Sequence, residues 1–315
     1  IIRYICVTKV RWINAAVRWC LWQSRQKRSC NINVMNKITE ELTPDQTRAI
    51  QTVLLELLCE VRRICELAKI RYTVIAGTLL GAVRHGGFIP WDDDADIGML
   101  REEYEAFRRA CDKYLDTSRF YFQDHTCIKG YRWGYGKLRR KDSSYVICGT
   151  EGLPYEQGIW IDIFPLDHVP DSRLGRELCS LHCFLIRKFM YSESGKYREK
   201  NPAKRIMYAA MSKVPISAVH KHFEKYIRRR NKKRTGWVRI LTFPTPNREY
   251  GYRRRWYEDM SDITFEGEVF TSVRDYEEYL TFKFGNYLEL PPKEEQKIHH
   301  RISEFKIPEE TEVRG

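Results

Sequence analysis

Four aspartates stand close together in the run DDDAD (92–96). The hydrophobic residues 97–99 follow directly, so the run is predicted to enter a buried strand. Because side chains two apart on a strand face the same side, Asp94 and Asp96 are expected to point together. Carboxylates this close resist ionisation unless a cation lies between them. Oxygen ligands suit Mg²⁺ or Mn²⁺, so the spacing predicts a metal site at Asp94 and Asp96 rather than a solvated acidic loop.

Asp162 is the expected third carboxylate, because two-metal phosphoryl chemistry needs a further bridging ligand. It is the lone charge in the apolar, β-branched run GIWIDIF (158–164). A carboxylate inside such a strand requires a partner. The alternative is a buried ion pair with an arginine. Asp167 is a weaker candidate, because Pro165 is expected to end the strand before it.

Gly77 and Thr78 follow a predicted strand (71–76) and open a short predicted helix (78–85). Free backbone N–H groups at a helix N-terminus bind phosphate, and Gly77 has no Cβ to block close approach. An ordinary turn is the alternative. Arg84, at the end of the same helix, and Lys137, in the later run WGYGKLRR (133–140), are the cations expected near the phosphate groups.

The elements that must position these residues alternate between helix and strand in the first half of the chain. Thr43 and Pro44 are typical of a helix start, and apolar residues at helical spacing continue to about Lys69. The second half is mostly helical or irregular. These patterns predict an α/β core with helical additions. Further strands are expected at 92–100, 119–124, 132–139 and 143–148, and in the β-branched, aromatic run 158–167 as far as Pro165. Further helices are expected at 101–115, 173–190 and 203–230.

Composition excludes several classes of protein. With 315 residues, 43% hydrophobic and 13% aromatic, the chain can bury a sizeable core, which excludes wholesale disorder. No apolar run approaches the ~18 residues that a spanning helix needs. The ten cysteines form no CxxC pair, which favours reduced thiols in a cytosolic protein. The net charge of +13 favours polyanionic partners.

The string GTLLGAVRHGGFIPWDDDADIGM (77–99), followed by WIDIFPLD (160–167), resembles the LicD family of phosphocholine transferases. The segment 265–300 is similar to the closing motif of that family, although Asn286 stands where an Asp is commoner. The resemblance covers about residues 36–300. The family is related to nucleotidyltransferases of the polymerase-β type and to the fukutin and fukutin-related ribitol-phosphate transferases.

The resemblance implies a nucleotidyltransferase-like α/β (α+β) fold, with a mixed-sheet core and helical C-terminal additions. It matches Gly77 and Thr78 with the glycine–hydroxyl turn of the family. Asp94 and Asp96 match its metal-binding DxD motif, and Asp162 matches its third carboxylate. These matches agree with the roles that the residue types favour.

Residues 1–34 differ in composition from the rest of the chain, and they match nothing in the family. They hold seven Lys and Arg, three Trp and no Asp or Glu, and the first Met is Met35. One interpretation is a basic, Trp-bearing arm on a membrane surface. We favour the other, a non-native or disordered extension before a start at Met35. The expected division is an extension (1–34), a LicD-like transferase domain (35–300) and a C-terminal tail (301–315).

The resemblance implies metal-dependent transfer of phosphocholine, or a similar phosphoalcohol, from a CDP-activated donor to a glycan hydroxyl. The acceptor would be a cell-surface glycan precursor of the lipopolysaccharide or teichoic acid kind. Two alternatives remain open. One is a nucleotidyltransferase that moves NMP onto a small molecule with the same carboxylates. The other is a non-enzymatic basic protein that binds membrane or nucleic acid, in which Asp94→Asn would leave function intact.

Two basic runs, 228–234 and 253–255, favour a solvated face or a patch for anionic lipid over a nucleic-acid site, because no nucleic-acid-binding motif accompanies them. A lipid-linked glycan acceptor would agree with such a patch. We therefore expect a cytoplasmic protein with peripheral contact to the inner face of the membrane, and no nucleic-acid partner. Aromatic residues in 243–257 and 276–287 are candidates for a cage around a quaternary ammonium, or for the core.

Overall fold

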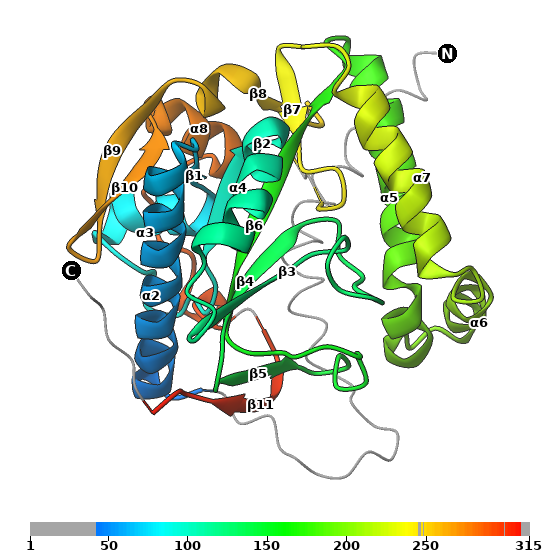
Figure 1. Ribbon diagram of the computed structural model, residues 1–315, viewed down its shortest axis with the longest axis horizontal. Helices are drawn as coiled ribbons and strands as arrows, with labels where there is room; N and C mark the ends of the chain where they lie inside the picture. Colours follow the sequence, from blue (N-terminus) through cyan, green and yellow to red (C-terminus); the bar gives the residue numbers. More distant parts are fainter. Residues whose placement is uncertain (1–41, 245–246, 248, 299, 310–315) are drawn as a thin grey trace.

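The computed structural model describes residues 42–309, except 245, 246, 248 and 299. Its centre is a seven-stranded mixed sheet in the order β1–β2–β6–β4–β3, and β7 and β8 extend it from the end of β6 (Figure 1). β2 and β6 run parallel, and the other pairs of this sheet are antiparallel. The predicted α/β mixed-sheet class is confirmed. The strands are β1 (Thr73–Val74), β2 (Asp96–Leu100), β3 (Phe120–Gln123), β4 (Gly136–Arg140), β6 (Trp160–Val169), β7 (Trp237–Arg239) and β8 (Tyr252–Arg253).

β6 runs through Pro165 to Val169, so the prediction that Pro165 ends the strand is wrong. A proline lacks the N–H that a ladder needs, and it is tolerated where no acceptor waits for that donor. β4 pairs with β6 only as far as Ile163, and β7 pairs with β6 only from Asp167. Pro165 falls between these two ladders. The strand therefore continues and buries Asp167.

The first helix confirms the predicted start. α2 (Pro44–Ala68) has Thr43 as its N-cap, and Thr43 and Gln46 form a reciprocal capping box. α2 and α4 (Arg101–Tyr114) lie side by side against one face of the sheet (Figure 1). α3 (Ala76–His85) begins two residues earlier than predicted, so that Gly77 and Thr78 lie in its first turn. α3 packs against β2 and against α8 (Tyr276–Phe284).

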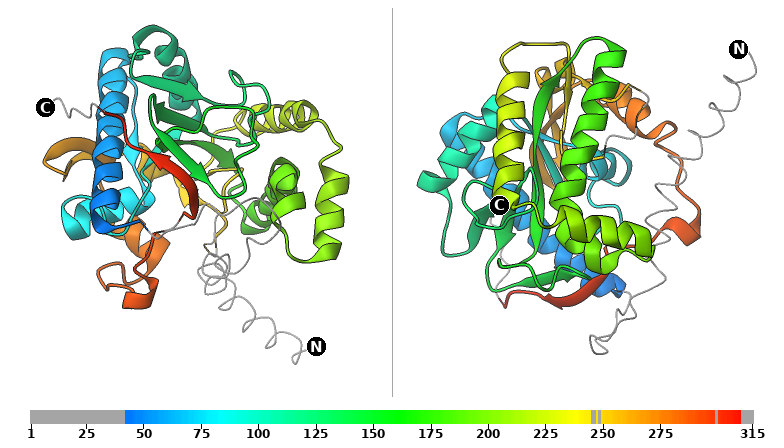
Figure 2. Two further views of the ribbon diagram at one scale, coloured as in Figure 1. Left: turned by 90° about the horizontal axis from the view of Figure 1, so that it is seen from below. Right: turned by 90° about the vertical axis from the view of Figure 1, so that its right-hand side faces the viewer.

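Three helices form an arm beside the sheet: α5 (Arg173–Arg198), α6 (Pro202–Met211) and α7 (Ile216–Arg230) (Figure 2). α5 is longer than predicted, and two helices replace the single one expected at 203–230. α5 and α7 pack against β6 and enclose a second hydrophobic cluster that includes Cys183, Phe223 and Leu241. The arm is therefore joined to the sheet by its own small core.

The last part of the chain returns to the sheet region. β9 (Met260–Phe265) and β10 (Glu268–Val273) form a hairpin, and β5 (Ser144–Ile147) pairs with β11 (Ile302–Lys306). Residues 301–315, expected as a tail, thus include a paired strand. Short 3₁₀ helices are η2 (Arg254–Tyr257) and η3 (Lys293–Glu295). The cysteines within the described ranges are free thiols. In the same ranges, every helix is too short or too polar to cross a bilayer. The predicted extension, 1–34, lies outside the described residues.

Candidate active site

Three neighbouring strands bring Asp96, Asp162 and Lys137 into one row. Asp96 on β2 is the register partner of Asp162 on β6, and Asp162 is the register partner of Lys137 on β4. Register partners present their side chains on the same face, a few ångströms apart. The Lys137 ammonium donates to the Asp162 carboxylate, and both side chains are buried. Asp162 thus has a basic partner, which is a lysine rather than the arginine of the alternative interpretation.

Asp94 lies before β2, because that strand begins at Asp96. The two residues therefore do not share one strand face as predicted, but their carboxylates still interact. Burial raises the pKa of Asp96 well above its ordinary value, and the charges of Asp94 and Asp162 raise it further. Burial likewise raises the pKa of Asp92, which shares a side-chain hydrogen bond with Asp94. The four carboxylates repel one another and favour any cation that enters.

A divalent metal ion fits this donor set in its chemistry. Buried carboxylate oxygens that raise one another's pKa are the hard ligands that Mg²⁺ and Mn²⁺ prefer. Across the part of the chain that the structure describes, no three His, Cys, Asp or Glu side chains already stand as a ligand group. The Lys137 ammonium neutralises Asp162 in this arrangement. Metal binding by Asp94, Asp96 and Asp162 stays a prediction.

The N-terminus of α3 packs against the acidic run. A Cβ added to Gly77 would lie 2.9 Å from Oδ2 of Asp92, so glycine permits this close approach. The Thr78 hydroxyl accepts a hydrogen bond from the backbone N–H of Asp96, at 2.8 Å. Ile75 provides no side-chain cap for the helix. Gly77 and Thr78 therefore fix the acidic run directly beside a helix N-terminus, as the phosphate-binding prediction requires.

Lys283 on α8 is a second cation near the carboxylates. It lies in the segment 265–300, which resembles a family motif, but that resemblance did not single it out. Burial lowers its pKa, but Tyr252, Tyr279 and Asp96 oppose burial and hold the pKa above its ordinary value. In turn, Lys283 and Lys137 limit the rise in the pKa of Asp96. Two lysines from distant parts of the chain thus face the same acidic cluster.

His300 is a further residue at the site that the sequence did not predict. Its Nδ1 lies 3.2 Å from Oδ2 of Asp93, and the Tyr145 hydroxyl donates to the same oxygen. Although burial lowers the pKa of His300, Asp93 raises it to about 9. The His300 ring lies 5.7 Å from the Trp160 ring, edge to face. Asp93 thus holds a protonated imidazole beside Asp94 and Lys137, the other charges that act on it.

Aromatic rings surround the Lys137 ammonium. Its Nζ lies 4.3 Å from the ring centre of Trp160, 5.4 Å from that of Tyr135 and 6.0 Å from that of Trp133. Such rings attract cations, most strongly where water is excluded. The predicted cage segments, 243–257 and 276–287, instead contribute mainly to the core, where the rings of Tyr252, Trp256, Tyr257 and Tyr279 are buried. The cluster of rings next to the carboxylates comes from other elements.

Other predicted residues have structural partners. Nη1 of Arg84 donates to the carbonyls of Tyr287 and Glu289, which ties α3 to the segment after α8. Both carboxylate oxygens of Asp167 accept from Arg101, each at 2.7 Å. Arg84 thus faces the C-terminal segment, and Asp167 belongs to a buried ion pair.

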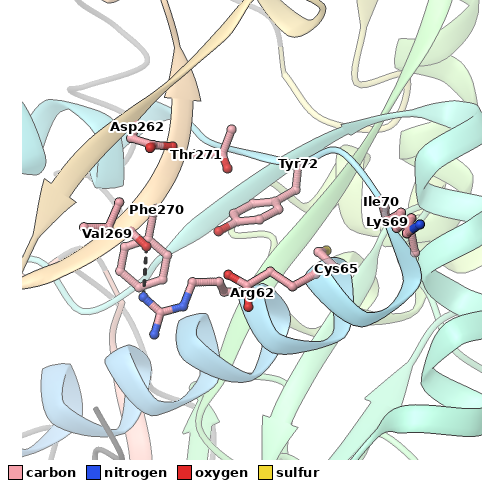
Figure 3. Close-up of a pocket in the computed structure, with 10 residues that line it drawn as sticks. Arg62, Cys65, Lys69, Ile70, Tyr72, Asp262, Val269, Phe270 and Thr271 are labelled. Carbon is pink, nitrogen blue, oxygen red and sulfur yellow. Dashed lines mark hydrogen bonds between the residues drawn. The ribbon is translucent and has the colours of Figure 1, made fainter.

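A separate hollow lies between α2 and β10 and is lined by Arg62, Tyr72 and Phe270, among others (Figure 3). Arg62 donates to the carbonyl of Val269, at 2.9 Å, and pairs with Glu268. None of the acidic residues of the row lines this hollow. The candidate site is therefore the acidic cluster at β2 and β6.

Comparison with known proteins agrees with this location. Residues 69–172, which hold the acidic run, Lys137 and Asp162, match a family model described as LicD/FKTN/FKRP, nucleotidyltransferase domain. The chain is 28% identical over 257 residues to lipopolysaccharide cholinephosphotransferase LicD of Haemophilus influenzae, covering 80% of this chain and 95% of that protein.

A shorter match links the chain to vertebrate proteins. It is 50% identical over 40 residues to ribitol 5-phosphate transferase FKRP of mouse and of human, covering 13% of this chain and 8% of each relative. Both sets of matches agree with the resemblance found in the sequence motifs. Residues 69–172 of the chain are therefore similar to the LicD/FKTN/FKRP nucleotidyltransferase domain.

Proposed function

We propose that the protein is a metal-dependent phosphoalcohol transferase. It moves phosphocholine, or a similar phosphoalcohol, from a CDP-activated donor to a hydroxyl group of a cell-surface glycan precursor. The observation that carries the proposal is the row Asp96–Asp162–Lys137, with Asp94 and the N-terminus of α3 beside it. Carboxylates, a cation and helix N–H groups together suit phosphoryl transfer, in which positioning and charge stabilisation do most of the work.

Asp94 and Asp96 are assigned to hold the metal, with Asp162 as the third ligand. When bound, Mg²⁺ or Mn²⁺ supplies positive charge against the diphosphate of the donor. The raised pKa of Asp96 supports this assignment, because a buried acidic cluster gains most from a divalent cation. The N-terminal turn of α3, with Gly77 and Thr78, is assigned to the donor phosphates.

The transfer step conserves charge and atoms. The acceptor hydroxyl oxygen forms a bond to the phosphorus of the phosphoalcohol, the phosphoanhydride P–O bond breaks, and CMP leaves. Asp162 orients the acceptor and takes its proton. Lys137 is assigned to the phosphate oxygens, because its ammonium already faces Asp162 and is within reach of the same row. His300, which Asp93 keeps protonated, adds a second donor for those oxygens.

The names of the relatives support the substrate class. One relative is a cholinephosphotransferase that acts on lipopolysaccharide, and the FKRP proteins are ribitol 5-phosphate transferases. A polar phosphoalcohol is common to these names, and a glycan acceptor agrees with the first of them. We extend both to this chain, together with a cytoplasmic location at the inner face of the membrane.

Product analysis tests the proposal. The full chain is incubated with Mg²⁺, a glycan acceptor and either CDP-choline, CDP-ribitol or CDP-glycerol, and CMP release is measured with and without acceptor. We expect acceptor-dependent CMP release from one of the three donors, and its loss in Asp96→Asn. The matched control is Asp262→Asn, which changes an exposed Asp on β9. CMP release that persists in Asp96→Asn would contradict the proposed site.

A nucleotidyltransferase is the second candidate function, because the matching family model is described as a nucleotidyltransferase domain. That reaction attacks the α-phosphate of a nucleoside triphosphate and releases pyrophosphate. The same protein incubated with CTP and a phosphoalcohol distinguishes the two. Pyrophosphate release without CMP release from the CDP-alcohols would favour this second function.

A further inference from the structure

α5 exposes a stripe of leucines on the side that faces away from its own core. Leu174, Leu178, Leu181 and Leu185 are 68%, 59%, 58% and 49% exposed. Their spacing of four, three and four residues places them on one face of the helix. The buried residues of α5, among them Cys183, lie on the opposite face and pack into the second hydrophobic cluster. The stripe is therefore not needed to hold α5 on the protein.

Basic residues of α7 run beside this stripe. Lys221, Lys225 and Arg228 are exposed and recur at helical spacing, so they share one face of α7. The two helices meet through His182 and His222, whose Nε2 atoms lie 3.1 Å apart. These histidines directly follow Leu181 and Lys221 in sequence. The contact therefore sets the leucine stripe next to the basic row.

The charge of the whole arm is strongly positive. Residues 173–234 hold eighteen Lys and Arg against four Asp and Glu. α6 adds exposed apolar surface, with Ile206 at 72%. Some cations of both basic runs have acidic partners: Arg228 pairs with Glu224 and Arg234 with Glu258, as Arg254 does with Glu258 and Arg255 with Glu278. The arm that carries the leucine stripe nevertheless keeps a large excess of positive charge.

We propose that this face docks on the surface of an anionic lipid bilayer. The docking face is defined by Leu174, Leu178, Leu181 and Leu185 of α5 and by Lys221, Lys225 and Arg228 of α7. Apolar side chains enter the boundary between headgroups and acyl chains, and flanking lysines and arginines contact anionic headgroups. The proposal extends beyond the proposed function, because it depends only on this surface and holds whatever reaction the site performs.

Charge complementarity favours a bilayer over a second copy of the chain. Two copies joined through their leucine stripes would bring two basic rows together, and like charges at an interface oppose association. An anionic membrane presents the opposite sign to the basic row and an apolar layer to the leucines. The bilayer is therefore the occupant that matches both parts of the docking face.

Vesicle co-sedimentation tests the proposal with the full chain. We expect strong binding to vesicles of phosphatidylcholine mixed with phosphatidylglycerol, much weaker binding to phosphatidylcholine alone, and weaker binding to the mixed vesicles as salt screens the charges. Lys221→Glu with Lys225→Glu should lower the partition coefficient about tenfold or more. Leu178→Ser with Leu181→Ser should remove the binding that survives high salt.

Matched controls change the same residue types elsewhere. Lys113→Glu with Lys129→Glu alters the net charge equally, and Leu67→Ser with Leu290→Ser replaces leucines that are each 53% exposed. Both control pairs should bind vesicles like the unchanged chain. Thermal unfolding midpoints, which should be equal for all variants, verify folding.

Three outcomes would overturn the docking proposal. The first two are no binding to either kind of vesicle and unchanged binding by both variants of the docking face. The third is a dimer in sedimentation velocity that Leu178→Ser with Leu181→Ser abolishes while vesicle binding persists. CMP release from a soluble donor is measured on the same samples and should not change. Vesicle binding without any CMP release would contradict the proposed function alone.

Discussion

Asp96 and Asp162 are direct register partners in β2 and β6, although a helix and three further strands separate them in the chain. The parallel pairing is what brings two carboxylates together at one end of a buried sheet. Their repulsion adds to the effect of burial and raises the pKa of Asp96 well above its ordinary value of 3.8. The same pairing therefore creates both the electrostatic cost of the site and its affinity for a cation.

Asp96→Asn should reduce transfer to below about a tenth of the unchanged rate at saturating Mg²⁺, because a metal ligand is lost. It should also raise the thermal midpoint of the metal-free protein. The folded state holds a proton on Asp96 that the unfolded state gives up, so the contribution of Asp96 to stability falls as the pH rises above about 4. The difference between the thermal midpoints of Asp96→Asn and of the unchanged chain should therefore widen as the pH rises. A midpoint difference that stays constant from pH 4 to neutral pH would contradict the assigned pKa shift.

Asp162→Asn should weaken the Mg²⁺ dependence and the rate together, because the variant keeps the shape of the side chain but removes its charge. The matched comparison is Asp167→Asn, on the same strand. Asp167 is fully buried against Arg101, whose other acidic partner is Glu105 at 3.4 Å. Loss of the Asp167 charge leaves the buried guanidinium with that weaker pair alone and should cost up to about 3–5 kcal/mol of unfolding free energy. Urea unfolding and an Mg²⁺ titration of the rate measure both effects.

Asp162→Asn and Asp167→Asn are expected to differ in their Mg²⁺ dependence. Asp167→Asn should leave the Mg²⁺ concentration for half-maximal rate unchanged. If Asp162→Asn lowers only stability, Asp162 is an ion-pair partner of Lys137 rather than a ligand. Asp124, which directly follows β3, is the other buried Asp that could be tested as a third ligand. It is a poor candidate, because Thr126 donates to its Oδ1 through both N–H and hydroxyl.

Asp93→Asn should lower the pKa of His300 from about 9, because burial is then opposed by the charge of Asp94 alone. The raised pKa stabilises the folded state below about pH 6.5, and this contribution is lost as the pH rises through about 9. NMR titration of the imidazole measures the pKa directly. Thermal midpoints of the unchanged chain and of His300→Gln should converge above pH 9. A His300 pKa near 6.5 in the unchanged chain would refute the pairing.

Gly77→Ala should lower the rate with little effect on stability. The added Cβ would lie 2.9 Å from Oδ2 of Asp92, so the Asp92 carboxylate, which interacts with Asp94, must shift away from the N-terminus of α3. Gly152→Ala is the matched control, because a Cβ there meets no atom within 4 Å. Initial rates and thermal midpoints of both variants check the expectation. Equal rates for Gly77→Ala and Gly152→Ala would show that the close approach at Gly77 is not needed for transfer.

Local signals predicted the fold where the deciding interactions are local. The start of α2 follows from Thr43, Pro44 and Gln46, because a capping box involves residues three apart. The predicted end of β6 was wrong. Pro165 is tolerated inside the strand because β4 pairs with the residues before it and β7 with the residues after it. Which strands pair with each part of β6 depends on tertiary structure and cannot be predicted from the sequence of β6 alone.

The residues of the candidate site likewise fall into those that local sequence signals indicate and those that only tertiary packing brings to the site. Asp94, Asp96, Asp162 and Lys137 stand out in the sequence as charged residues in or beside strand patterns, and the structure brings them together. Lys283 and His300 lie in segments without a clear period, and only packing sets them beside the carboxylates. A charged residue in an irregular segment carries no local sign of its partner.

The position of His300 sets when the site is complete during synthesis. His300 lies two residues before the first residue of β11, and β11 pairs with β5, which carries the Tyr145 that also binds Asp93. A nascent chain folds from its N-terminus as it leaves the ribosome, so the carboxylates assemble before the imidazole arrives. Ribosome-bound chains stalled before residue 300 would therefore hold the acidic row without its histidine.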